Sequence, residues 1–479
     1  MQNKCPIFWI NYIFNVTLHL EMKYNTYTLD NGLRIIHLPS DSQVVYCGYQ
    51  INAGTRNEEP GEEGLAHFCE HVTFKGTERR KAWHILNCLE SVGGDLNAYT
   101  NKEGTVYYSA ILKEHIARAV DLLSDIVFHS VYPQAEIDKE VEVICDEIES
   151  YNDSPAELIY DEFENILFKG SLLGHNILGT AEQVRAFKTE DALRFTQKLY
   201  RPDNAIFFAY GDIDFKKLVK LIQKALGECP KGRELACSAD CKSAETPTEE
   251  RIAEETPTKE RITEETPTSE TPTEEMEAGD ANHKVQSSKF NIQSKVAGQT
   301  IVMQKNTHQA HVMIGTQAYD VNDDRRMPLY LLNNMLGGPG MNAKLNLALR
   351  EHNGLVYTVE STMVAYGDTG TWSIYFGCDE HDVKRCLRLV RKELDKFMQK
   401  PLSDAQLKAA KKQIKGQIGV ACDNRENFAL DFGKSFLHYG WEKNVDRLYE
   451  QVDEITAAQI QAVAQELFDK DRLTTLIFK

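Results

Sequence analysis

The sequence lacks any long apolar run. None of its 479 residues belongs to an uninterrupted stretch of about eighteen apolar side chains, roughly the length that a membrane-spanning helix needs. We therefore expect no membrane span. The chain also lacks a glycine-rich turn that follows a strand and opens a helix, which argues against a nucleotide-binding fold. No basic stripe offsets the formal net charge of −18, so nucleic acid is not an expected partner.

Residues 1–22 lack the features of a targeting segment. They hold an apolar patch, but no small-residue cleavage site and none of the arginines and serines of a mitochondrial transit peptide. Our first interpretation is a non-native extension that precedes a true start at Met22, and the runner-up is a weak signal sequence.

The eleven cysteines are odd in number and scattered, which indicates reduced thiols. We expect a cytoplasmic location, or a periplasmic one if residues 1–22 act as a signal.

One short stretch puts two imidazoles and a carboxylate on one side of a helix. His67, Glu70 and His71 follow the order His-x-x-Glu-His. At about 100° per residue, His71 lies about 40° from His67, and Glu70 about 60° to the other side. Two neutral imidazoles at this spacing can bind one zinc ion, and the glutamate can accept a proton from water. A half-buried histidine pair with a glutamate partner is the alternative, because a zinc site needs a third protein ligand.

A helix predicted from Gln134 to Tyr151 offers that ligand. Its apolar side chains recur with a helical period and define the buried face: Ile137, Val141, Ile144 and Ile148. Glu140 and Glu147 lie two turns apart on the rim of this face. Carboxylates beside an apolar face lose solvation unless a positive group opposes them. An acidic helix whose rim touches water is the alternative, but the His-x-x-Glu-His motif favours a zinc partner.

With these residues the chain resembles the inverzincin peptidases of the insulinase and mitochondrial processing peptidase family. It is most similar to the short-chain, processing-peptidase-like branch, over nearly the whole chain outside one insert and the first two dozen residues. The resemblance implies that Glu147 joins His67 and His71 in binding one Zn²⁺ per chain. It also implies that Glu140 contacts these ligands without binding the metal itself, and that Glu70 is the catalytic base.

The resemblance further implies two groups of substrate contacts. Asn97 and Ala98 correspond to an edge strand whose backbone pairs with an extended peptide. On local sequence alone they equally suit a strand start shaped by the preceding glycines. Arg350 and Tyr357 correspond to a pair that binds substrate and stabilises the tetrahedral oxyanion. Their local chemistry also suits a helix C-terminus and a strand core, which is the simpler interpretation.

The middle of the chain changes composition. The sequence Glu-Thr-Pro-Thr recurs there, and residues Glu245 to Asp280 contain thirteen acidic against three basic side chains. Such a segment cannot bury enough apolar surface to order itself, so we predict a disordered acidic linker over residues 231–286. Much of the net charge is therefore a property of the linker and says little about the substrate.

The two sides of the linker predict a duplicated α+β fold. Strands and helices are interspersed without a regular βαβ alternation. The pair Glu114-His115 recurs as Glu380-His381 at the same offset from a Gly-Thr pair, while Lys408 and Lys415 stand where Glu140 and Glu147 would fall. We expect two homologous halves, each a mostly antiparallel sheet with helices on one face: a catalytic zinc-binding half over residues 23–230 and a metal-free half over residues 287–479.

These observations predict a zinc-dependent endopeptidase that cleaves unfolded peptides or precursor segments in an enclosed chamber. Because the chain has only two halves, we expect two copies of it to form a homodimer that closes the chamber. A heterodimer with a different chain is the alternative. The alternative function is a catalytically silent assembly subunit, or a peptide-binding partner of a heterodimeric peptidase. Relatives of that silent kind lose zinc ligands, whereas this chain keeps them. The sequence does not define the substrate.

Overall fold

The computed structural model describes residues 23–227, 298–305 and 307–479. The predicted linker at 231–286 and the extension at 1–22 lie outside the described residues. Within the described ranges, no helix is long and apolar enough to cross a membrane. The described parts of both halves belong to one structural unit.

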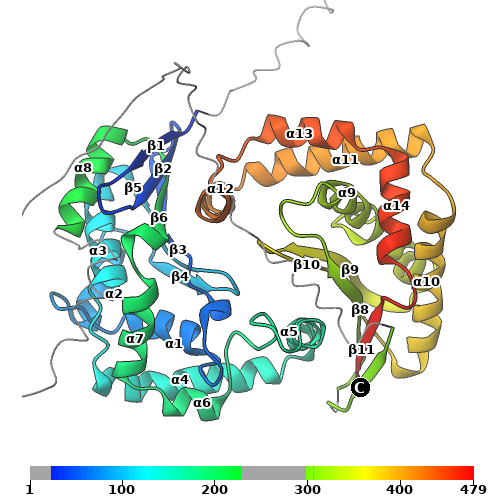
Figure 1. Ribbon diagram of the computed structural model, residues 1–479, viewed down its shortest axis with the longest axis horizontal. Helices are drawn as coiled ribbons and strands as arrows, with labels where there is room; N and C mark the ends of the chain where they lie inside the picture. Colours follow the sequence, from blue (N-terminus) through cyan, green and yellow to red (C-terminus); the bar gives the residue numbers. More distant parts are fainter. Residues whose placement is uncertain (1–22, 228–297, 306) are drawn as a thin grey trace, which may run out of the picture. The chain divides into compact units, whose positions relative to one another are not determined.

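The first half contains a six-stranded sheet with the strand order β1-β2-β6-β3-β5-β4 (Figure 1). Its strands are β1 (Asn25–Thr28), β2 (Arg34–Pro39), β3 (Val44–Ile51), β4 (Asn97–Thr100), β5 (Thr105–Leu112) and β6 (Ala205–Gly211). Neighbouring strands are antiparallel except β2 and β6, which are parallel. The sheet is therefore mostly antiparallel, as predicted.

Eight helices belong to the described part of the first half. They are α1 (Leu65–Thr73), α2 (Ala82–Glu90), α3 (Ile116–Phe128), α4 (Gln134–Asn152), α5 (Pro155–Leu167), α6 (Ala181–Ala186), α7 (Thr189–Leu199) and α8 (Phe215–Leu226). The helix predicted at 134–151 is confirmed as α4. Side chains alternate between the faces of a strand, so Val45, Cys47 and Tyr49 of β3 point into the core shared with α1, α3 and α4.

The second half repeats this plan. Its strands are β7 (Thr300–Met303), β8 (Ala310–Ala318), β9 (Val356–Ala365), β10 (Gly370–Cys378) and β11 (Thr474–Phe478), in the order β7-β11-β8-β10-β9. Its helices are α9 (Arg326–Gly337), a π-helical turn (Asn346–Glu351), α10 (Val383–Gln399), α11 (Asp404–Cys422), α12 (Arg425–Tyr439), α13 (Val445–Glu454) and α14 (Ala457–Leu467). Again one described pair, β7 with β11, is parallel. The predicted α+β fold with two homologous halves is confirmed.

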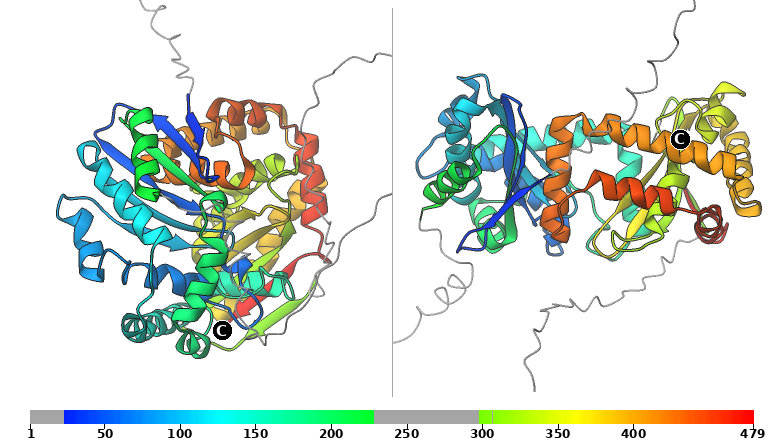
Figure 2. Two further views of the ribbon diagram at one scale, coloured as in Figure 1. Left: turned by 60° about the vertical axis from the view of Figure 1, so that its left-hand side comes forward. Right: turned by 90° about the horizontal axis from the view of Figure 1, so that it is seen from above.

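The second face of each sheet is covered by a helix from the other half, which the sequence did not predict. Phe432 of α12 packs edge-on against Phe208 of β6, with ring centroids 6.4 Å apart. In return, Leu158 and Phe163 of α5 pack in one cluster with Met313 of β8. Figure 2 shows α12, in orange, beside the strands of the first half. The two halves therefore exchange equivalent helices.

Candidate metal centre

Helices α1 and α4 bring together three side chains that could hold a metal ion. His67 and His71 lie one turn apart on α1, with ring centroids 4.6 Å apart. Glu147 of α4 faces both rings: its carboxylate oxygens lie 3.8 Å from Nε2 of His67 and 3.3 Å from Nε2 of His71. One ligand atom from each of the three lies within 4.8 Å of the others. We call the point between them the metal position.

The charges around the metal position suit a cation. Burial by itself lowers the pKa of His71, but its hydrogen bonds with Glu140 and Glu147 outweigh burial and raise the pKa to about 9. Burial and the neighbouring His71 lower the pKa of His67 to about 4, so His67 is neutral near pH 7. Zinc binds neutral imidazoles and ionised carboxylates, and the carboxylates that favour a proton on His71 would also favour a metal cation in its place. The donor set therefore fits zinc.

Glu140 orients His71 by a contact with Nδ1, the ring nitrogen that does not face Glu147. Its Oε1 lies 3.0 Å from Nδ1 of His71, and its Oε2 lies 2.5 Å from Nζ of Lys75. Burial alone would raise the pKa of Glu140, but the hydrogen bonds from His71 and Lys75 lower it below its ordinary value. Glu140 thus stays charged and leaves Nε2 of His71 free for the metal position. Lys75 was not predicted, because no local pattern shows that a lysine after α1 reaches a carboxylate on α4.

Glu70 lies on α1 between the two histidines but outside the group of three. Its side chain is buried, and its Oε2 accepts a hydrogen bond from Thr100 Oγ1 of β4 at 2.5 Å. Burial raises the pKa of Glu70, while the bond from Thr100 opposes that change. The sequence did not single out Thr100. The structure therefore holds this carboxylate apart from the ligand set, where it can exchange a proton.

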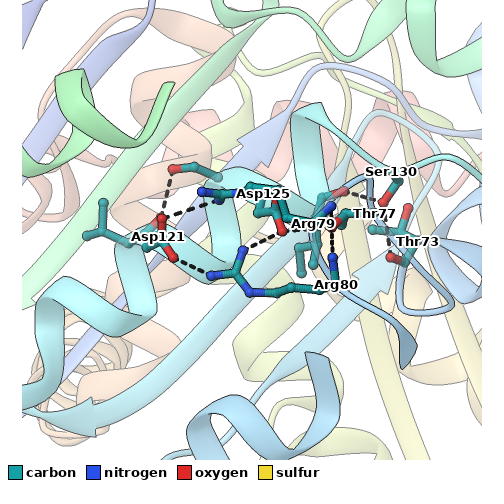
Figure 3. A network of polar contacts seen from close by, with 10 residues as sticks. Thr73, Thr77, Arg79, Arg80, Asp121, Asp125 and Ser130 are labelled. Carbon is teal, nitrogen blue, oxygen red and sulfur yellow. Dashed lines mark hydrogen bonds and ion pairs between the residues drawn. The ribbon is translucent and has the colours of Figure 1, made fainter. Parts of the chain in front are cut away.

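A buried aspartate fixes the segment that follows α1, which ends at Thr73 (Figure 3). Asp125 of α3 is fully buried and accepts hydrogen bonds from Thr77 Oγ1 at 2.8 Å and Arg79 Nε at 2.9 Å, and it pairs with Arg80. Burial alone would raise the pKa of Asp125, but these donors lower it. The chain that leaves the histidine helix is thus tied to the core of the first half.

Asn97 and Ala98 begin β4, which is the edge strand of the first sheet. Ala98 pairs with Tyr107 of β5, and no other described strand pairs with β4. Asn97 is exposed and Ala98 half-buried. One side of β4 therefore presents backbone groups that another strand could pair with. Thr100, at the end of the same strand, contacts Glu70.

Arg350 and Tyr357 lie in the second half and line a cavity of about 760 Å³ there. The Arg350 guanidinium carbon lies 5.7 Å from the ring centroid of Tyr357, whose side chain is 82% exposed. Among the described residues, no hydrogen bond, ion pair or ring contact joins either residue to His67, His71 or Glu147. The structure thus brings Arg350 and Tyr357 together.

The second half has no comparable donor set on its equivalent helix. Lys408 and Lys415 lie on α11, and Lys415 forms an ion pair with Asp453. Ammonium groups are donors of hydrogen bonds and not metal ligands. The metal-free second half stays a prediction, because Asp379, His381 and Asp382 also lie close enough together there to hold a metal ion.

The chain is similar to known proteins over most of its length. A family model described as "Insulinase (Peptidase family M16)" matches residues 35–181. A second, described as "Peptidase M16 inactive domain", matches residues 186–414. The chain is 28% identical over 453 residues to the uncharacterized zinc protease YmxG of Bacillus subtilis, covering 94% of this chain and 97% of that one.

One further protein is similar to the chain in sequence and another in fold. The chain is 29% identical over 446 residues to the mitochondrial-processing peptidase subunit beta of Saccharomyces cerevisiae, covering 91% and 86% of the two chains. A solved structure of a protease from Helicobacter pylori covers 96% of this chain and 99% of its own, with a TM-score of 0.77 and 20% identity, which shows a shared fold. Because the two family models together span residues 35–414 almost without a gap, the chain belongs to the insulinase family of peptidases, peptidase family M16.

Proposed function

We propose that this protein is a zinc-dependent endopeptidase that cleaves unfolded peptides or precursor segments. The observation that carries the proposal is the convergence of His67, His71 and Glu147, which come from two helices far apart in sequence. Relatives named zinc proteases support it. A single zinc per chain would be held by these three residues, which leaves a fourth coordination position open for the reaction.

Zinc and Glu70 would have different roles in the hydrolysis of a peptide bond. Zinc, when bound, supplies Lewis acidity, which lowers the pKa of water and polarises a carbonyl group. Glu70 accepts a proton from the attacking water and later returns it to the leaving amine. Proton transfer by a positioned carboxylate contributes a factor of about 10² to 10⁴ in rate. Thr100 holds Glu70 in place for both transfers, through the hydrogen bond to Oε2.

The substrate would bind in an extended form along β4. An added strand pairs through main-chain hydrogen bonds, which carry little side-chain information and so suit varied sequences. Asn97 and Ala98 lie at the start of this edge, and Thr100 at its end touches Glu70. A peptide on β4 would therefore pass close to the catalytic base.

Arg350 and Tyr357 would stabilise the negative charge that develops on the scissile carbonyl oxygen. A donor of this kind is often worth about 3 kcal/mol. Since this pair makes no contact with the described metal ligands of its own chain, the proposal places it against a substrate held by a second chain. A homodimer meets this need, and a heterodimer is the alternative, because one relative is named as a subunit of a processing peptidase.

The competing proposal is a silent assembly or peptide-binding subunit. One structural neighbour, from Pseudomonas fluorescens and 16% identical, is described as a "peptidase M16 inactive domain". The complete set of His67, Glu70, His71 and Glu147 favours catalysis here.

The seven described cysteines are free, which is compatible with the reducing, cytoplasmic location expected from the sequence.

Cleavage of a defined peptide mixture tests the proposal. The full chain is incubated with the mixture with and without a chelator, and mass spectrometry maps the cuts. We expect cuts that disappear with chelator, return with zinc and are absent in Glu70→Gln. Glu90→Gln, at an exposed carboxylate of α2, is the matched control and should cleave normally. Zinc bound in full without any cuts would instead support the silent subunit.

A further inference from the structure

Helix α1 starts without a cap of its own. Its N-cap residue is Gly64, which has a φ of 96° and no side chain to satisfy the first N–H groups. Glu58 supplies the missing acceptor from six residues earlier. Its Oε2 accepts from the N–H of Gly64 at 3.1 Å, and its Oε1 accepts from the N–H of Ala66 at 2.8 Å. A carboxylate here also faces the positive end of the helix dipole.

Glu58 is a buried carboxylate with a second partner. Its side chain is 1% exposed, and Nε2 of His175 lies 2.9 Å from its Oε2. Burial raises the pKa of Glu58, and the bonds from His175, Ala66 and Gly64 oppose that rise. The carbonyl oxygen of His175 accepts a hydrogen bond from Lys102, itself 4% exposed, in the turn between β4 and β5. The start of α1 is thus joined to two other segments of the first half.

This first turn has little room to shift. A Cβ atom on Gly64 would lie 2.7 Å from the carbonyl oxygen of Leu178, and one on Gly179 would lie 2.1 Å from that of Glu63. The backbones of the two segments therefore lie in direct contact. His67 belongs to the same turn of α1, so any movement of the turn moves Nε2 of His67 relative to Glu147.

We infer that Glu58, together with His175, is a positioning residue that sets the place of His67 at the metal position. This inference rests on the proposed function. Glu58 touches no side chain of the ligand set and acts through the backbone of Gly64 and Ala66. Residues that orient metal ligands typically change metal affinity about 10- to 100-fold when they are mutated.

The test measures metal binding by the full chain, without substrate. Zinc affinity is determined by competition with a coloured chelator, and Co²⁺ replaces zinc so that its visible spectrum reports the ligand geometry. Glu58→Ala should lower zinc affinity about 10- to 100-fold and alter the Co²⁺ spectrum. Glu58→Gln keeps an acceptor oxygen and should recover most of the affinity. With peptide, Glu58→Ala should lower kcat more than it changes KM.

Asp214→Ala provides the matched control. Asp214 caps α8, where its Oδ1 accepts from the N–H of Lys217 at 2.7 Å, so this variant loses a carboxylate cap that does not touch α1. It should lower the melting temperature without changing zinc affinity or the Co²⁺ spectrum. His175→Ala is the second variant, should Glu58→Ala fail to fold, and is expected to weaken zinc binding several-fold.

Two results overturn the inference in different ways. If the wild-type chain binds zinc and cleaves peptide, and the Glu58 and His175 variants keep wild-type affinity and spectrum, then Glu58 is only a structural cap. If the wild-type chain binds no zinc, the proposed function fails and the inference fails with it.

Discussion

Nδ1 of His71 lies 3.0 Å from Oε1 of Glu140. This contact between α1 and α4 fixes one nitrogen of the ring, so the other nitrogen is directed at the metal position. The helix that carries Glu147, the proposed carboxylate ligand, therefore also orients His71, a proposed imidazole ligand. The site depends on the packing of two helices, and several of its properties can be tested separately.

The role of Glu147 as third ligand can be tested by metal content. Glu147→Gln replaces an anionic oxygen by a weaker neutral donor, so we expect bound zinc to fall well below one per chain after dialysis, as measured by elemental analysis. Glu149→Gln changes an exposed carboxylate about 200° further round the same helix and should keep the wild-type zinc content. Full zinc content in Glu147→Gln would place the third ligand elsewhere.

Lys75 should support the site through Glu140. Lys75→Met removes the ion pair that holds Oε2 of Glu140 at 2.5 Å. With Glu140 less firmly held, we expect zinc affinity to fall about tenfold, measured by chelator competition. Lys75→Arg should restore part of it, and Lys81→Met, at an exposed position, should have no effect. An unchanged affinity in Lys75→Met would show that Glu140 orients His71 without help.

Mixing two inactive chains tests whether the active site spans a dimer. Glu70→Gln removes the base, and Tyr357→Phe removes the hydroxyl that would stabilise the oxyanion. If Tyr357 acts on the substrate of the partner chain, a mixed dimer regains one of its two sites. Random pairing makes half of the dimers mixed, so co-expression should restore roughly a quarter of wild-type kcat. Activity no higher than that of either variant alone would place both residues in one chain's site.

Asp125 predicts a defined dependence of stability on pH. Because its folded-state pKa lies below the ordinary value of 3.8, the folded state binds fewer protons there than the unfolded state. The stabilisation of the fold by ionised Asp125 is complete above the ordinary pKa of 3.8, and it is lost as the pH falls through the lower folded-state pKa. Asp125→Asn should cost about 2 kcal/mol near neutral pH, and progressively less below about pH 4.

Urea unfolding in the presence of chelator measures this effect without any contribution from bound metal. The wild-type and Asp125→Asn curves should converge as the pH is lowered. A difference in unfolding free energy that stays constant from neutral to acid pH would mean that the aspartate stabilises the fold independently of its charge.

The sequence predicted the parts of the site that depend on local periodicity. The two-turn spacing of Glu140 and Glu147 predicted that both would lie together on the rim of the apolar face of α4. In the structure both contact His71, with the Glu140 side chain 12% exposed and the Glu147 side chain 46% exposed. The His-x-x-Glu-His order likewise placed three side chains on one face of α1. The choice of Glu147 as the partner of His67 came from the family resemblance, because local spacing does not reveal which helices pack together.

Other contacts depend on tertiary packing and have no local signal. Lys75, Thr100 and Glu58 reach groups that lie far from them along the chain or across a loop. The exchange of α5 and α12 between the halves was missed for the same reason. An amphipathic pattern shows that a helix has an apolar face, but it does not show which sheet that face covers.

The most direct measurement is an anomalous difference map from crystals of the zinc-loaded protein, collected on either side of the zinc absorption edge. The account predicts one strong peak per chain, bonded to Nε2 of His67, Nε2 of His71 and a carboxylate oxygen of Glu147. A map with no peak there, or a peak with Glu147 turned away from both rings, would contradict it.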